Sequence, residues 1–157
     1  MKPTTILIGA AIAVTVTIVA AFLSGVGRPP QEGQADPSDV RQVALGERVY
    51  REHCAACHGA GLEGQPDWQS RRPDGRLPAP PHDESGHTWH HADEVLFRIT
   101  RDGVSAIVPG YDSDMPAYAD VLKDEEIWAV LAFIKSQWPS AIQARHANIN
   151  RRSDPPR

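Results

Sequence analysis

The stretch "REHCAACHGAG", from Arg51 to Gly61, contains both cysteines of the 157-residue chain. Two residues separate Cys54 from Cys57, and His58 follows directly. In a helix this spacing puts the two thiols about one turn apart. A Cys-x-x-Cys-His pattern is compatible with covalent haem attachment, with a redox-active dithiol and with half of a zinc site.

Covalent attachment of haem accounts best for all three residues. Two thiols one helical turn apart can add to two vinyl groups on neighbouring pyrroles, and His58 then projects toward the iron. A redox dithiol belongs between a strand and a helix, and no strand pattern precedes Cys54. A zinc site would leave His58 unexplained, and a disulfide across two residues would stabilise little. We therefore predict that Cys54, Cys57 and His58 bind one covalent haem c.

Three helices are predicted around this motif, and no strand pattern is present. The first begins after an N-cap at Ser38 or Asp39 and runs to the cysteines. The second covers Ala92–Thr100, and the third lies in "KDEEIWAVLAFIKSQW" (123–138), where apolar residues recur at helical spacing. The segment Gly59–Gly86 reads as a loop. Because so small a helical domain contains little apolar material, another group must fill its centre.

With these features the chain resembles the class I c-type cytochromes. In that family a glycine and an aromatic residue on the N-terminal helix pack against an aromatic residue on the C-terminal helix. Gly46, Tyr50 and Phe133 stand at the matching places in this sequence. The resemblance implies an all-α, cytochrome c-like domain wrapped around one covalent haem. It also implies that a proline carbonyl, Pro80 or Pro81 with Pro80 preferred, orients His58.

The resemblance assigns the sixth iron ligand to Met115, in the loop segment "SDMPAY". A thioether ligand stabilises Fe(II) and raises the reduction potential. In the alternative, Met115 only fills a gap in the core. A histidine ligand is a second alternative, which the position of the Met loop disfavours; the candidates are His82, His87, His90 and His91.

These four histidines share the short segment His82–His91. One interpretation is a polar loop over the haem edge. The other is a second metal ion, such as copper, because imidazole is a good ligand for copper, zinc and nickel. The second interpretation places that ion at His87, His90 and His91, and we favour the first.

The N-terminal residues 1–27 are predicted to be a membrane anchor or a signal segment. Ile6–Leu23 is almost wholly apolar, and its length is closer to the about 20 residues of a spanning helix than to the about 7–15 of a signal peptide core. We favour an uncleaved transmembrane helix. Lys2 precedes it, so the N-terminus is expected in the cytoplasm and the haem domain in the periplasm of a bacterial inner membrane. Cleavage would leave the domain in the same compartment.

The remaining boundaries follow from composition. Residues 28–38 are rich in Pro, Gly and Gln and read as a flexible linker. Residues 39–139 form the predicted cytochrome c domain. Residues 140–157 form a polar tail, helical at first and disordered from about Asn150.

The predicted function is electron transfer rather than enzymatic catalysis. With both axial positions filled by protein, the iron has no open site for a substrate. We expect single electrons to pass between respiratory redox proteins of the periplasm or membrane. The formal charge of −4 disfavours nucleic acid. Two alternatives are a haem-based ligand-binding or peroxidase-like protein, in which Met115 dissociates, and a copper-handling protein that uses His82–His91.

Overall fold

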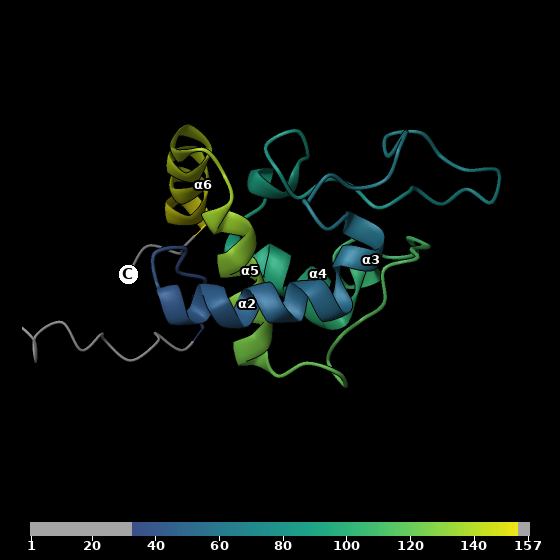
Figure 1. The fold of residues 1–157 in the computed structure, drawn as a ribbon. Helices are drawn as coiled ribbons and strands as arrows, with labels where there is room; N and C mark the ends of the chain where they lie inside the picture. The colour runs from purple at the N-terminus through teal and green to yellow at the C-terminus, as the bar shows by residue number, and fades with distance from the viewer. Residues whose placement is uncertain (1–32, 154–157) are drawn as a thin grey trace, which may run out of the picture. The chain divides into compact units, whose positions relative to one another are not determined.

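The computed structural model describes residues 33–153, which fold into helices joined by long loops (Figure 1). The described part of the chain contains no β-strand, so the all-α prediction is confirmed. Its helices are α2 (Val40–His53), α3 (Ala55–His58), α4 (Asp93–Asp102), α5 (Asp124–Ser136) and α6 (Ser140–Ser153), with two short 3₁₀ turns, η1 (Thr88–His90) and η2 (Val104–Ala106).

Local sequence signals set the ends of these helices. The side chain of Asp39 accepts hydrogen bonds from the amides of Arg41 and Gln42, which satisfies two free donors at the start of α2. Helix α4 ends at Gly103, whose φ of 87° lies in the left-handed region that glycine tolerates best. Acidic residues fill the first turn of α5, where they complement the helix dipole.

Helix α2 packs mainly against α5, and a glycine permits the close crossing. A Cβ placed on Gly46 would lie 1.9 Å from the carbonyl oxygen of Ala129 and 2.9 Å from the Cβ of Phe133. One turn further along α2, the ring of Tyr50 lies 5.3 Å from that of Phe133. The predicted packing of Gly46, Tyr50 and Phe133 is therefore confirmed.

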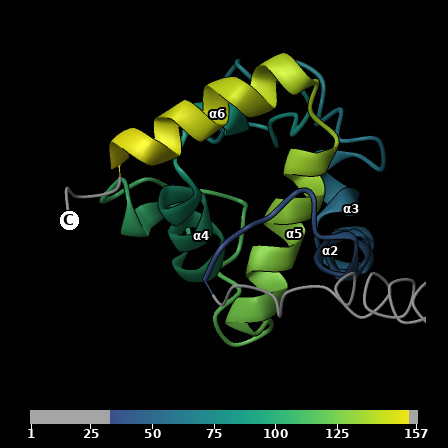
Figure 2. The same ribbon diagram turned by 90° about the vertical axis from the view of Figure 1, so that its left-hand side faces the viewer.

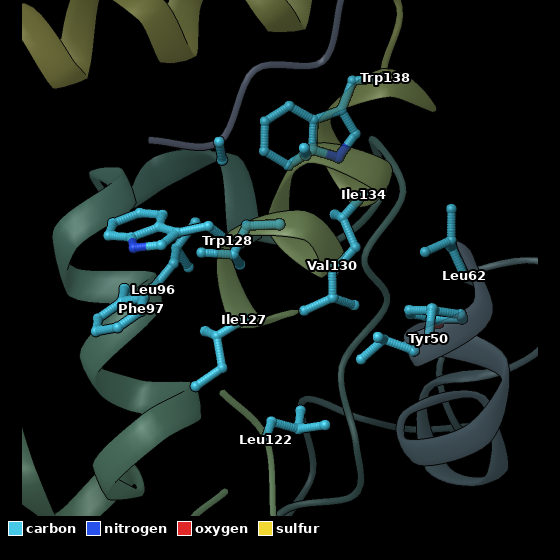
Figure 3. Close-up of a cluster of buried hydrophobic side chains, with 14 residues drawn as sticks. Tyr50, Leu62, Leu96, Phe97, Leu122, Ile127, Trp128, Val130, Ile134 and Trp138 are labelled. Carbon is cyan, nitrogen blue, oxygen red and sulfur yellow. The ribbon is translucent and has the colours of Figure 1, made fainter. Parts of the chain in front are cut away.

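Helix α5 lies at the centre of the core and contributes buried side chains to both of its neighbours (Figure 3). Toward α4, the ring of Trp128 stacks on Phe97 at 4.3 Å. Toward α2, the buried side chains of Val130 and Ile134 extend from α5 to the side on which the buried Tyr50 lies. The nearly all-apolar sequence of α5 fits this position, because most of its residues from Ile127 onward are buried.

The C-terminal helix α6 differs from the prediction. It continues to Ser153, so the expected disorder from about Asn150 is wrong for the described residues. His146 is 1% exposed and its Nε2 donates to the carbonyl of His91 at 3.0 Å. Asn150 and Asp93, at the start of α4, exchange two hydrogen bonds. Figure 2 shows the two helices that these bonds join, α6 and α4. These polar contacts hold a helix whose own sequence has a weak apolar face.

The end of the predicted linker also packs against the domain. Ala35 is 5% exposed, and its carbonyl accepts a hydrogen bond from Lys135 at 2.6 Å. The packed structure therefore begins before Asp39. The predicted anchor, residues 1–27, lies outside the described residues. Among residues 33–153, no helix has the length and apolarity needed to cross a membrane.

Candidate haem-binding site

The two cysteines lie where α2 passes into α3. Cys54 is the residue between the two helices, and its amide still donates to the carbonyl of Tyr50 as a continuing helix would. Cys54 is half-buried, Cys57 is exposed, and both thiols are free. Helical geometry therefore presents two unpaired thiols one turn apart, as the haem prediction requires.

His58 directly follows Cys57 and is almost fully buried, at 6% exposure. Its Nδ1 lies 2.8 Å from the carbonyl oxygen of Pro80. A carbonyl can only accept, so Nδ1 carries the proton and Nε2 keeps a free lone pair. Burial lowers the pKa of His58, and the hydrogen bond to Pro80 opposes this only partly. The imidazole is thus neutral, with Nε2 ready to bind a metal.

Glycines fix the loop that carries Pro80. Gly64 has a φ of 68°, and a Cβ there would lie 2.5 Å from the nitrogen of Pro81. A Cβ on Gly86 would lie 2.0 Å from the carbonyl oxygen of Pro81. At either position a side chain would clash with the backbone of Pro81, which cannot rotate away. The two glycines therefore let the chain pass close to this backbone, and this close packing holds the Pro80 carbonyl against His58.

His82 packs against His58 on the same side of the site. The two rings stack with centroids 4.0 Å apart, and Nδ1 of His82 lies 2.8 Å from the hydroxyl of Thr88. Two rings in face-to-face contact leave no room for a porphyrin between them. His82 therefore lies against His58, and the two imidazoles could not hold one haem iron between them.

The other histidines of the segment His82–His91 pack against different aromatic rings and do not converge on one point. His87 stacks on Trp68 and His90 stacks on Trp89, while the rings of His87 and His91 are 5.5 Å apart. In residues 33–153, no group of three or more His, Cys, Asp or Glu side chains is arranged to hold a metal ion. The structure gives no support to a second metal site at His87, His90 and His91.

Met115 lies half-buried in the loop between η2 and α5. Its amide donates to the hydroxyl of Ser113 at 3.1 Å. Two ion-pairing carboxylates precede it: Asp114 accepts from Arg72 and from Arg76, and Asp112 accepts from Arg76. We did not expect these ion pairs from the sequence, because the partners lie about 40 residues apart and no local pattern links them.

A second contact ties the Met115 loop to the haem motif. The hydroxyl of Tyr118 donates to the carbonyl of His53 at 2.8 Å, at the end of α2. That carbonyl belongs to the last turn of a helix, where it has no partner within the helix. The loop that carries Met115 is thus bonded on one side to the turn before Cys54.

The donor set fits haem c. Cys54 and Cys57 present two free thiols one helical turn apart. The buried imidazole of His58 follows them, with its ring oriented by Pro80 and its Nε2 unprotonated. In the part of the chain that the structure describes, no cluster of His, Cys, Asp or Glu side chains forms a competing metal site. The sequence has no third cysteine. With only two cysteines, the chain has the attachment points for a single haem.

Residues 41–134 match the model of one protein family, described as cytochrome C oxidase, cbb3-type, subunit III. The match begins at the second residue of α2 and ends at Ile134 in α5, and it includes Cys54, Cys57, His58 and Met115. Comparison with curated proteins and with solved structures gave no match.

Proposed function

The chain belongs to the family described as cytochrome C oxidase, cbb3-type, subunit III, and from this membership we propose that it is a membrane-tethered, monohaem electron carrier of the periplasm. As a c-type cytochrome it binds haem c covalently and takes part in electron transfer. The proposal adds the tether, the compartment and the two axial ligands.

The observation that carries the proposal is the bond between His58 and Pro80. A carbonyl held 2.8 Å from Nδ1 fixes both the tautomer and the direction of the ring. When bound, haem c would supply a one-electron Fe(II)/Fe(III) couple. Cys54 and Cys57 would hold it covalently, and His58 and Met115 would bind the iron. With both of these residues bound, no iron position would remain for a substrate, which suits the transfer of single electrons.

The apolar segment within residues 1–27 supports the tether and the periplasmic location. A tethered domain meets membrane-bound partners at high effective concentration. We propose that those partners are redox proteins of a respiratory chain, and that the domain serves them as a carrier or as an electron-transfer subunit of a larger oxidoreductase.

The test uses the full-length chain expressed with export and haem attachment. Haem staining of a denaturing gel should show haem bound to the wild type and none bound to Cys54→Ser/Cys57→Ser. Replacing Met115 with Ala should abolish the sulfur-to-iron absorption band and lower the potential. Val108→Ala, a change at an exposed residue of the same loop, is the control and should keep both the absorption band and the potential of the wild type. An unchanged band in Met115→Ala would remove Met115 as the ligand.

A further inference from the structure

Residues 65–80 form a narrow excursion of the chain, which we call the strap. Figure 1 shows it as the long loop that follows α3. Its two arms are joined by backbone hydrogen bonds from Gln65 to Ala79 and from Arg72 to Arg76, each 2.9 Å. The side-chain oxygen of Gln65 also accepts from the amide of Ala79 and from Arg72. The strap is therefore an internally bonded unit rather than a slack connection.

The far end of the strap grips the loop that carries Met115. Nη1 of Arg72 lies 2.8 Å from one oxygen of Asp114, and Nη1 of Arg76 lies 2.7 Å from the other. Nη2 of Arg76 reaches Asp112 at 3.0 Å. Both oxygens of Asp114 are thus held by separate guanidinium groups, one residue before Met115.

The near end of the strap reaches the other side of the site. Its last residue, Pro80, supplies the carbonyl that orients His58. One short segment therefore contacts the histidine through its base and the neighbours of the methionine through its tip. The tip is far in sequence from its partners, so these ion pairs, together with the packing of Arg71 over the ring of Tyr111, join the strap to the Met115 loop.

Isolated ion pairs at a protein surface contribute little to stability, so the simplest interpretation is that these charges are only solvated. Three observations weigh against it. Arg72 is held in place by Gln65, Asp114 is shared by two arginines, and the same Arg76 joins both carboxylates. Such a network is stronger than separate pairs. Its side chains remain 38–69% exposed, so salt should weaken it.

We propose that the strap keeps the Met115 loop closed on the haem site, with Arg72 and Arg76 as positioning residues that act through Asp112 and Asp114. The inference rests on the proposed ligation by Met115. Opening of the loop would release the thioether and leave the iron open to an added ligand. The strap would thereby set how often the site opens, and ionic strength would control it.

Carbon monoxide binding to the reduced, full-length holoprotein measures that opening, because a six-coordinate iron must lose one ligand first. Arg72→Gln/Arg76→Gln should bind carbon monoxide about 5-fold faster than the wild type at low ionic strength. The wild-type rate should rise toward that of the variant between about 0.01 and 1 M salt, while the variant rate stays flat. Arg101→Gln is the matched control, because Arg101 also pairs with two carboxylates, Asp102 and Asp124, at similar exposure.

The comparison with Met115→Ala separates this inference from the proposed function. If Met115→Ala binds carbon monoxide no faster than the wild type, the ligand assignment fails. If Met115→Ala is fast but the double arginine variant behaves like Arg101→Gln, the inference about the strap fails alone. Asp112→Asn/Asp114→Asn breaks the same pairs from the other side and should reproduce the arginine variant. A salt-independent wild-type rate would overturn the inference without any variant.

Discussion

The backbone of Gly46 lies so close to Ala129 that a single added methyl group would overlap the carbonyl oxygen, at 1.9 Å. This contact fixes how closely α2 and α5 cross. It also determines where the last turn of α2 delivers Cys54 and His58, since both follow directly on that helix. A glycine within a helix thus positions a site eight residues further along the chain.

Gly46→Ala should destabilise the protein by about 1–3 kcal/mol, the usual cost of overpacking a core. Alanine favours a helix over glycine by about 1 kcal/mol, so helix propensity alone predicts the opposite sign. We expect the steric term to win, because the neighbour is backbone and cannot rotate away. Denaturant unfolding measures the difference. Ala44→Gly, a change at an exposed residue of the same helix, is the control. Its loss of unfolding free energy should reflect only the lower helix propensity of glycine.

Lys135→Met should destabilise the protein by about 3 kcal/mol, because it leaves a buried carboxylate without its cation. Nζ of Lys135 lies 2.6 Å from Asp93, and their side chains are 9% and 18% exposed. The double variant Lys135→Met/Asp93→Asn should lose less unfolding free energy than Lys135→Met alone, since no uncompensated charge remains. Unfolding free energies of the single and double variants form a cycle. Strictly additive losses would show that the two groups do not interact.

The sequence predicted those parts of the molecule that depend on local chemistry. Asp39 as an N-cap and the apolar spacing of α5 predicted two helices. The packing of Gly46 against the last of these helices was predicted from the resemblance to c-type cytochromes. The Cys54–His58 motif located the site, because its chemistry needs that spacing. The bond from His58 to Pro80 followed from the resemblance to c-type cytochromes.

The parts that were missed depend on contacts between distant residues. Helix α6 extends past Asn150 because Asn150 and His146 bond to Asp93 and His91, about 55 residues earlier. The pairs from Arg72 and Arg76 to Asp112 and Asp114 have no local signature either. A single sequence gives propensity and periodicity but does not say which polar groups meet in space.

Tyr118→Phe should destabilise the protein by about 1 kcal/mol, the usual value of a lost hydrogen bond. The hydroxyl of Tyr118 donates to the carbonyl of His53 at 2.8 Å, so the variant leaves that helix-end carbonyl without this partner. Thermal unfolding gives the change. Tyr111→Phe is the control: that ring lies under Arg71, and its hydroxyl makes no hydrogen bond within residues 33–153. Equal losses in the two variants would show that the hydrogen bond from Tyr118 to the carbonyl of His53 does not account for the loss of stability.

His146 should make the stability of the protein depend on pH. Burial lowers the pKa of His146, nearby Lys135 lowers it too, and Asp93 and the carbonyl of His91 oppose this only in part. The ring is therefore neutral in the folded chain, whereas in the unfolded chain it takes up a proton below about pH 6.5. Unfolding then binds a proton, so the free energy of unfolding falls as the pH drops below that value, by up to about 1.4 kcal/mol per pH unit.

His146→Gln keeps an N–H donor for the carbonyl of His91 but cannot titrate. Its unfolding free energy, measured in denaturant from neutral pH down to about pH 5, should therefore decline less steeply than that of the wild type. The other buried histidines are present in both proteins, so the difference between the two curves isolates His146. Parallel curves would mean that His146 is protonated to the same extent before and after unfolding, and that its burial in α6 carries no electrostatic cost.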